Sequence, residues 1–520
     1  MADQTQKELH DNTRAFRDNY ITGNLTNEVH LGAAKGLAAL AAFIGDHHSK
    51  LVQEITRCMA LPPQTTPYQL DVGEETGLEL YWASEWIASP PPWFDQWKKE
   101  HPVYLIALDI LAEALKLVEH LKMSKAQYDW LMSMADTPGL VGNDGTIFGF
   151  AKYEQLDRKW MIAALNYVLN VVHNDIHPFV GANLTAEPMS SQQGKVEVVL
   201  GIVGDWGGGA YKEGPNKDIP SPAERVKSDL ERHSLDYLVH LGDTYYAGTD
   251  GHSRLGPDSA NEEQDNLVDM WPKGCADRSF TLNSNHEMYG AADGYFKVAL
   301  EKPGLFPKQH GASYFALEYK FGKDKDQSWL VLGLDSAYFS DQQNGHKMYM
   351  DGAIGVDRGS AKQTEQMTQI RALAEQHPGP IMVMTHHNPW DTITRKVNRL
   401  FLQVETALKR QPTLWYWGHV HNGIVYPDVV DGPETLGRCC GHGAVPFGNA
   451  WGIAEQTKTL YYSHTHDDAF DAGNPRVYNG YALVAFQGDG SVIETFYEIR
   501  KPGEDGVRVW SAQWKPPGAG

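Results

Sequence analysis

The most constraining feature of this sequence is a change in the spacing of its apolar residues near Lys195. After that point, short apolar runs of strand length alternate with signals for helix starts, and several runs are rich in Val, Ile or aromatic residues. The runs are VEVVLGIV (196–203), LDYLVHL (235–241), WLVLGL (329–334), IMVMT (381–385) and TLWYW (413–417). Strands that alternate with helices predict a layered α/β domain, because the helices cover the faces of the sheets.

Two helix starts and one hairpin are predicted inside this region. Residues 221–224 (Ser-Pro-Ala-Glu) form a capping box with proline at the first helical position. Residues 360–363 (Ser-Ala-Lys-Gln) form a similar pattern, which predicts a second helix that continues through Ile370. Residues 478–499 alternate between apolar and polar around a Gly-Asp-Gly turn, so we expect a closing β-hairpin there.

The chain before this region has a different pattern. Residues 30–178 place apolar side chains three and four positions apart over long windows, as amphipathic helices do. Residues 177–195 are polar and show no period, which predicts a linker. The sequence therefore predicts a helical N-terminal domain of unknown role at 1–188, an α/β domain at 195–500 and a C-terminal tail at 501–520.

Composition excludes some classes of partner. The chain has 66 acidic and 45 basic residues, a net charge of −21, so neither nucleic acid nor an anionic membrane is an expected partner. The longest apolar window, Leu31 to Gly45, contains Lys35 and is shorter than the roughly 20 residues that span a bilayer. The chain starts without a secretory signal pattern, and its 4 cysteines do not form a disulfide framework. We expect a cytoplasmic location, and the sequence names no partner for the helical domain.

Polar side chains follow the predicted strands at the points where the strands end. The blocks are Gly204-Asp205-Trp206-Gly207, Gly242-Asp243-Thr244-Tyr245-Tyr246, Ser284-Asn285-His286-Glu287, His386-His387-Asn388-Pro389 and Gly418-His419-Val420-His421. Ligands of α/β sheets bind outside the carboxyl ends of strands, and mixed oxygen and nitrogen donors suit transition metals. These donors suffice for two ions that share one carboxylate, and such a pair activates water and stabilises displacement at phosphorus.

In this order the five blocks resemble the calcineurin-like metallophosphoesterase superfamily. The resemblance implies a sandwich of mixed sheets flanked by helices, and hydrolysis of small-molecule phosphate esters, most directly phosphomonoesters. Two details resemble the purple-acid-phosphatase-like branch of this superfamily. Gly207 stands where the first block usually has a histidine, and the second block ends in Tyr246.

The resemblance also implies a set of metal ligands. One ion would be held by Asp205, Asp243, Tyr246 and His421, and the other by Asp243, Asn285, His386 and His419, with Asp243 as the bridge. Tyrosinate is a hard ligand that suits Fe(III), so iron is expected in the Tyr246 site and iron, zinc or manganese in the other. Tyr246 could instead be a packing residue beside Tyr245. The spacing Val-x-x-His selects His386, whereas His-x-Pro selects His387, and we prefer His386 because it directly follows the strand.

Four residues are candidates for catalysis: His286, Glu287, His387 and His442. By resemblance, His286 would face the phosphate and either protonate the leaving oxygen or stabilise the transition state, and Glu287 could orient its ring. His442 lies in a glycine-rich turn after the last block, from which it could approach the substrate. His419 and His421 are two residues apart, so in extended backbone their side chains would point the same way.

Other functions remain open at this stage. A Ser/Thr protein phosphatase is disfavoured because it would have Asp-Arg-Gly after the second aspartate, where this chain has Ala247-Gly248. A phosphodiesterase would use the same metal chemistry, and a metal-binding scaffold without activity is the alternative from outside enzymes. Residues 45–48 (Gly-Asp-His-His) also match the first block, but they follow an alanine-rich segment and are expected to be a solvated helix end. Residues 462–468 are expected to form a polar loop.

Overall fold

The computed structural model describes residues 176–213, 218–246, 262–301, 305–340, 349–355, 364–392, 394–427, 433–445, 459–463, 465–467 and 475–516, and a short antiparallel pair, β1 (Leu140–Val141) with β2 (Ile147–Phe148). The predicted helices before residue 176 and the Gly-Asp-His-His pattern at 45–48 lie outside the described residues. Residues 176–250 and 261–520 belong to one compact unit, and the fold reported below is that of this unit.

One sheet has six strands, in the order β20-β19-β18-β4-β7-β8. Their bounds are β4 (Val198–Val203), β7 (Tyr237–His240), β8 (Ser279–Thr281), β18 (Gly480–Phe486), β19 (Val492–Glu498) and β20 (Val507–Trp514). β4, β7 and β8 are parallel, and β18, β19 and β20 add to them antiparallel. The predicted hairpin is confirmed as β18 and β19. β20 shows that the sheet continues past residue 500, where the sequence analysis began a tail.

The second sheet has eight strands, in the order β15-β13-β14-β12-β11-β10-β9-β3. Their bounds are β3 (Glu187–Pro188), β9 (Phe315–Phe321), β10 (Gln327–Gly333), β11 (Ile381–Thr385), β12 (Leu414–Trp417), β13 (Gly423–Val425), β14 (Leu436–Cys440) and β15 (Tyr461–Tyr462). The four central strands, β10, β11, β12 and β14, are parallel. β9 runs antiparallel to β10 and parallel to β3, and β13 runs antiparallel to β14 and β15. All five apolar runs therefore contain strands, as predicted.

Two short antiparallel pairs lie outside these sheets: β5 (Lys212–Glu213) with β6 (Ile219–Pro220), and β16 (Thr465–Asp467) with β17 (Pro475–Val477). β15 and β16 include most of the residues 462–468 that the sequence analysis expected to form a loop. That segment is strand because its backbone pairs with β13, which is distant in sequence, and with the nearby strand β17.

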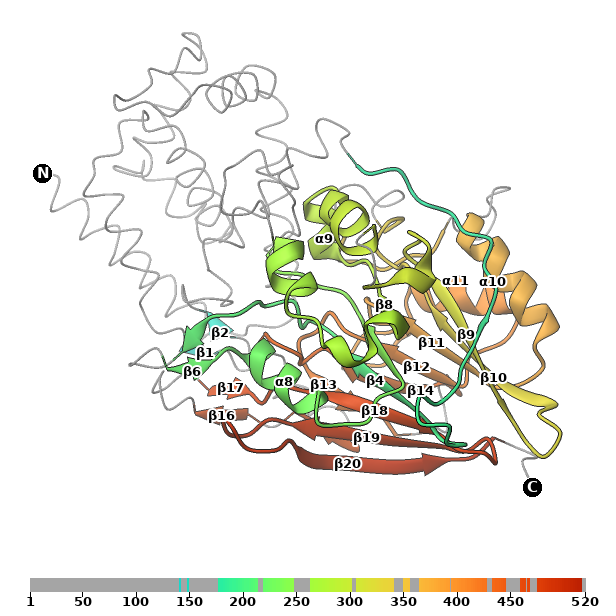
Figure 1. The fold of residues 1–520 in the computed structure, drawn as a ribbon. Helices are drawn as coiled ribbons and strands as arrows, with labels where there is room; N and C mark the ends of the chain where they lie inside the picture. The colour runs from blue at the N-terminus through green and yellow to red at the C-terminus, as the bar shows by residue number, and fades with distance from the viewer. Residues whose placement is uncertain are drawn as a thin grey trace, which may run out of the picture. The chain divides into compact units, whose positions relative to one another are not determined.

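The two sheets pack face to face, and helices cover the eight-stranded sheet on its other side (Figure 1). Side chains such as Leu200 and Met382 fill the layer between the sheets, whereas Trp415 packs with the helices. Cys439 and Cys440 are successive residues of β14, so they point to opposite faces and enter different cores as free thiols. The structure confirms the predicted layered α/β sandwich for the described residues.

The helices begin at side-chain caps. α8 (Pro222–Leu230) has the predicted capping box, in which the Ser221 hydroxyl accepts from the Glu224 amide and the Glu224 carboxylate accepts from the Ser221 amide. α10 (Glu365–Gln376) is capped by Thr364, so it begins after the predicted residues 360–363, which lie outside the described part of the chain. The remaining helices are α9 (Asn285–Tyr289), α11 (Arg399–Leu408), two π-helices (Glu263–Val268, Tyr295–Leu300) and two 3-10 helices (Lys273–Arg278, Pro307–Gln309). Among the described residues no helix is both long enough and apolar enough to cross a bilayer.

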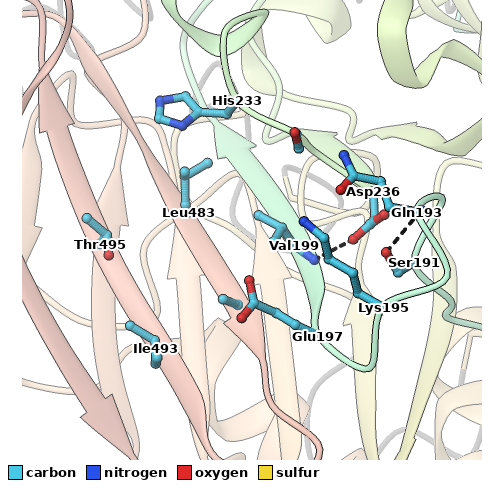
Figure 2. A pocket seen from close by; sticks show the side chains of 12 residues that line it. Ser191, Gln193, Lys195, Glu197, Val199, His233, Asp236, Leu483, Ile493 and Thr495 are labelled. Atoms are coloured by element: carbon cyan, nitrogen blue, oxygen red, sulfur yellow. Dashed lines mark hydrogen bonds between the residues drawn. The ribbon is translucent and has the colours of Figure 1, made fainter.

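The outer face of the six-stranded sheet carries a shallow hollow of about 240 Å³ (Figure 2). Its base is formed by Val199, Leu483 and Ile493, which lie on the adjacent strands β4, β18 and β19, and Lys195 and His233 lie at its rim. The hollow lies at the amino-terminal end of β4. It is therefore separate from the polar residues at the carboxyl ends of the strands.

Candidate metal centre

The carboxyl ends of parallel strands from both sheets meet at one edge of the sandwich, and the polar blocks occupy the loops that follow them. Asp205 follows β4, Asp243 follows β7, Asn285 follows β8, His386 follows β11, and His419 and His421 follow β12. The ligand atoms of Asp205, Asp243 and His386 all lie within 4.8 Å of one another. Residues that are up to 216 positions apart in the chain thus share one site.

The backbone turns sharply at four of these residues. Asp205, Asp243, His419 and His421 have φ angles of 53°, 74°, 70° and 49°. Left-handed backbone is unfavourable for residues other than glycine and is often found at functional sites. The expected extended backbone at His419 and His421 is therefore wrong, although both rings still reach the cluster.

The first group of donor atoms surrounds the phenol of Tyr245. Its Oη atom lies 3.0 Å from Asp243 Oδ2 and 3.3 Å from Asp205 Oδ1. His421 Nε2 lies 3.2 Å from this Oη atom and 3.4 Å from Asp205 Oδ1. This group combines two carboxylates, a phenol and an imidazole.

The second group lies on the other side of the Asp243 carboxylate. His386 Nε2 lies 3.3 Å from Asp243 Oδ1 and 2.8 Å from Asn285 Oδ1. His419 Nδ1 lies 3.2 Å from both His386 Nε2 and Asn285 Oδ1. Asp243 therefore directs one carboxylate oxygen at each group.

The donor atoms of the second group are arranged as ligands. His386 Nδ1 donates to the Leu241 carbonyl at 2.9 Å, so the neutral ring directs the lone pair of Nε2 into the cluster. Burial lowers the pKa of His386 to about 3, which keeps the ring neutral. The Asn285 amide nitrogen donates to the Tyr289 hydroxyl at 2.9 Å, so its Oδ1 atom faces the same point. Acceptor atoms converge in this way around a cation.

The spacing of the donor atoms also fits metal ions. Ligand atoms that bind one ion at about 2.1 Å stand about 3.0 to 3.4 Å apart, which matches most of the distances above. Burial and the neighbouring Asp243 charge raise the pKa of Asp205 well above its usual value. Two buried carboxylates side by side are costly unless positive charge balances them. The residues present therefore fit a pair of cations that share Asp243.

Glycines allow the loops to approach one another. A Cβ atom on Gly207 would lie 2.6 Å from the Asp243 carbonyl oxygen, because the loops after β4 and β7 pack directly together. A Cβ atom on Gly418 would lie 2.4 Å from Asp205 Oδ2. Gly207, the residue that departs from the usual histidine, thus has a packing role at this site.

The structure places Tyr245, and not the predicted Tyr246, with its hydroxyl against the two carboxylates. Tyr246 is buried, and its backbone carbonyl accepts a short hydrogen bond from His286 Nδ1. The sequence contains both tyrosines side by side, and the backbone conformation of the loop decides which phenol points at the carboxylates.

His286 and Glu287 lie in α9, next to this loop. The His286 ring contacts the rings of Tyr245 and Tyr289, at centroid distances of 5.0 and 4.9 Å, and burial lowers its pKa. Glu287 was expected to orient this ring, but its Oε1 atom accepts from the Thr244 amide at 3.0 Å and its Oε2 atom shares a hydrogen bond with the Ser284 hydroxyl. Burial and the Asp243 charge raise the pKa of Glu287 to about 8. Glu287 thus holds the Asp243 loop, and the Tyr246 carbonyl orients His286.

His387 lies beside the second group of donors. Its ring centroid is 4.7 Å from that of His419. However, its Nε2 atom donates to the Tyr349 carbonyl at 2.6 Å, and Nδ1 lies 2.9 Å from the Ser336 hydroxyl. His387 also forms a group with His386 and His419 whose ring nitrogens lie within 4.8 Å of one another, but the Tyr349 carbonyl and the Ser336 hydroxyl hold both nitrogens of the His387 ring.

The structure does not bring His442 to the site. Its buried ring stacks on Phe496 in the layer between the sheets, with a centroid distance of 6.2 Å. Gly441 is the residue of this turn that meets the centre, since its Cβ would lie 2.9 Å from Asp205 Oδ2. The His442 ring therefore lies away from the donor groups, contrary to the expectation that it approaches the substrate.

Two polar residues near the site were not singled out from the sequence. Ser284 donates to Asp243 Oδ1 and caps α9. Asp335 is buried directly after the WLVLGL strand and contacts Asn283. A signal for Asp335 was present, because it follows a predicted strand as the other blocks do.

Residues 198–423 match the family model described as calcineurin-like phosphoesterase. No curated protein matches the chain significantly. Similar solved structures include GAP50, described as the anchor in the inner membrane complex of Plasmodium, with 13% identity, a TM-score of 0.41, and coverage of 62% of this chain and 90% of that one. The purple acid phosphatase PPD1 from yellow lupin (Lupinus luteus) seeds has 12% identity and a TM-score of 0.39, over 63% and 54% of the two chains. The calcineurin-like phosphoesterase YfkN from Bacillus subtilis has 11% identity and a TM-score of 0.29, over 61% and 90%.

These structural similarities concern the fold alone, and the assignment rests on the family model. The match covers both carboxylates, Asn285 and the three histidines that surround the shared Asp243. Over residues 198–423 the chain therefore matches the calcineurin-like phosphoesterase family, and this match supports metal-dependent hydrolysis of phosphate esters.

Proposed function

We propose that this domain hydrolyses phosphomonoesters at a dinuclear metal centre. The observation that carries the proposal is the position of Asp243, which lies between two buried groups of donor atoms and directs one oxygen at each. A shared carboxylate of this kind holds two ions close enough to act on one phosphate. When bound, the ion pair supplies an activated water and positive charge for the phosphate oxygens.

In this proposal the chain's residues divide between the two ions. Asp205, Asp243, Tyr245 and His421 hold one ion, and Asp243, Asn285, His386 and His419 hold the other. Gly207 and Gly418 allow the loops to pack, and Glu287 holds the Thr244 amide beside Asp243.

The phenol suggests the metal of the first site. A tyrosinate oxygen beside two carboxylates is a hard donor set that favours Fe(III), in line with the resemblance to purple acid phosphatases. We assign this role to Tyr245 in place of Tyr246, because the Tyr245 hydroxyl lies among the other donors. The second site would take iron, zinc or manganese.

His286 is the residue proposed to move a proton. Because its Nδ1 atom faces the Tyr246 carbonyl, which can only accept, Nδ1 carries a hydrogen and proton transfer would run through Nε2. The ring contacts Tyr245 at the edge of the first donor group. Because burial lowers the pKa of the ring, Nε2 would take up a proton only when the negatively charged phosphate enters the site and offsets the cost of the imidazolium charge. The protonated ring would then donate this proton to the leaving oxygen of the ester and return to its neutral form.

The test of the proposed function is the variant Asp243→Asn. We expect about two metal ions per wild-type chain by elemental analysis, and loss of both metal and activity in the variant, because one carboxylate serves both ions. Asp324→Asn, at an exposed turn, is the matched control and should leave both unchanged. Full metal content and undiminished turnover in Asp243→Asn would rule out the shared site.

The class of ester is tested separately, because the number of metal ions at the site does not tell whether the substrate is a monoester or a diester. The metal-loaded protein would be assayed with aryl and alkyl monoesters, linear and cyclic diesters, and nucleotides. A preference for monoesters supports the proposal, and a preference for diesters would replace it with a phosphodiesterase. Metal binding without turnover of any of these esters would favour the scaffold alternative.

A further inference from the structure

The loop after β10 carries a buried carboxylate to which the proposed function gives no role. β10 lies between β9 and β11, and its loop reaches the edge of the sandwich where the metal ligands lie. Asp335 in this loop is fully buried. We propose that Asp335 is a positioning residue for the Asn285 side of the metal centre, an inference that rests on the proposed dinuclear site.

The contact between Asp335 and the ligand loop is direct. The side-chain amide of Asn283 lies 3.2 Å from Asp335 Oδ2 and 3.4 Å from Asp335 Oδ1. Asn283 is also fully buried, and its amide contacts the Met288 sulfur of α9 at 3.3 Å. Asn283 precedes Asn285 by two residues, so Asp335 fixes the start of the short helix that presents the ligand.

Asp335 is itself held rigidly from two directions. Its Oδ1 atom accepts from the amides of Ala337 and Tyr338, at 3.0 and 2.9 Å. The Gln366 side chain binds the Asp335 backbone at both ends, accepting from its amide at 2.8 Å and donating to its carbonyl at 3.0 Å. Gln366 belongs to α10, which packs on the eight-stranded sheet. A rigid support therefore extends from α10 through Asp335 and Asn283 to Asn285.

The contacts require an acceptor at position 335. The neighbours of this carboxylate act as donors: two backbone amides, the Asn283 amide group and the Ser313 hydroxyl. An asparagine at 335 could still accept from the backbone amides with its oxygen, but its amide group would then face the amide group of Asn283. Asn283 could keep this contact only by turning its amide over, which would bring its oxygen to the new amide group and take its Nδ2 atom away from the Met288 sulfur. The arrangement of Asn283 would therefore change while the turn at position 335 was kept.

The experiment compares Asp335→Asn, Asn283→Asp and the double exchange Asn283→Asp/Asp335→Asn. Metal-free protein is titrated with Mn²⁺ or Zn²⁺, bound metal is counted by elemental analysis, and thermal unfolding is followed in parallel. Loss of a direct contact to a metal ligand typically lowers metal affinity about 10- to 100-fold, and Asp335 acts on Asn285 through Asn283, so the lower end of this range, about 10-fold, applies. We expect Asp335→Asn to lower the affinity for one of the two ions by this factor and to leave the affinity for the other ion near its wild-type value. The double exchange should restore the affinity for this ion, because a carboxylate and an amide group again face each other.

Asp236→Asn is the matched control. Asp236 is also buried, and it accepts from the backbone amides of Gln192 and Val199, at 2.5 and 2.9 Å, at the amino-terminal end of β4. This control should lower thermal stability without changing the affinity for either ion. If Asp335→Asn does not fold, Asn283→Ala removes the same contact and is judged by the same result.

The outcomes separate the two proposals. Suppose that the wild-type protein binds two ions. If Asp335→Asn then has the same metal affinity as the Asp236→Asn control, or if the double exchange does not restore affinity, the positioning role is overturned and the proposed function stands. Wild-type protein that does not bind two ions overturns the proposed function, and the positioning role with it.

Discussion

Tyr245 and Tyr246 are neighbours in the chain, yet their polar atoms have different surroundings. The Tyr245 hydroxyl lies with the carboxylates, while the Tyr246 carbonyl orients His286. A one-residue difference therefore decides which phenol lies against the two carboxylates. The two tyrosines allow a paired experiment in which each variant is the control for the other.

The first prediction is that Tyr245→Phe removes the colour of the iron-loaded, oxidised protein and Tyr246→Phe does not. The colour expected by resemblance to purple acid phosphatases comes from charge transfer from phenolate to Fe(III), so it requires the bound phenol. Visible absorption of both variants, with iron content measured on the same samples, decides the assignment. Bleaching by Tyr246→Phe alone would restore the position implied by resemblance, and a colourless wild type would indicate a divalent site.

The second prediction concerns His286. We expect His286→Ala to lower kcat by roughly 10²-fold with metal content near normal, since general acid catalysis contributes roughly 10² to 10⁴. The loss should be smaller for esters with good leaving groups, which need little proton donation. Steady-state kinetics on activated aryl and poor alkyl phosphates measures this difference. Equal losses for both classes would mean that His286 positions the substrate instead.

At the scale of elements, a buried ion pair joins the two sheets. Arg438 of β14 donates two hydrogen bonds to Glu494 of β19, each 2.9 Å long, and the Tyr416 hydroxyl of β12 donates to the same carboxylate at 2.6 Å. Both charged side chains are almost fully buried. Because the pair lies in the layer between the sheets, it fixes the position of one sheet on the other.

The third prediction is that Glu494→Leu lowers the free energy of unfolding by about 3–5 kcal/mol, because it leaves a buried guanidinium without its carboxylate. The double variant Arg438→Met/Glu494→Leu should lose much less, since apolar side chains of similar volume can replace a buried pair. Urea denaturation of the metal-loaded proteins gives both values. A single variant as stable as the wild type would show that the pair adds nothing to the contact between the sheets.

For the whole molecule, metal binding and folding should be coupled. The proposed ligands come from both sheets, so the two sites exist only when the sandwich is assembled. Without cations, Asp205 and Asp243 are buried side by side, and this arrangement opposes folding. Ions that bind only the folded chain stabilise it by mass action.

The fourth prediction is that chelation lowers the unfolding temperature and that added metal raises it in a concentration-dependent way. Above saturation, each tenfold rise in free metal should add about 1.4 kcal/mol per site. Thermal unfolding in buffered Zn²⁺ or Mn²⁺ measures this slope. An unfolding temperature that does not depend on free metal would contradict binding to the folded state. The Asp243→Asn variant should show no slope.

The sequence predicted the strands more reliably than the orientation of individual side chains. Apolar runs such as IMVMT and the capping box at Ser221 are local patterns, and both formed as predicted. The second helix begins at Glu365, after its predicted start, because Thr364 provides the cap. Glu287 and His442 do not make the contacts that the sequence predicted. Glu287 binds the Thr244 amide and His442 stacks on Phe496, and both partners are far away in the chain.

The sequence by itself determined the order of strands and polar blocks, and thereby the family and the edge of the sandwich where the donors meet. This information is local, because periodicity and residue type at strand ends depend on a few neighbouring positions. Only the tertiary structure decided that the Tyr245 hydroxyl faces the carboxylates, that His442 stacks on Phe496, and that Asp335 contacts Asn283. These choices depend on left-handed turns and on packing between the two sheets, where distant segments meet and a shift of one residue reverses the direction of a side chain.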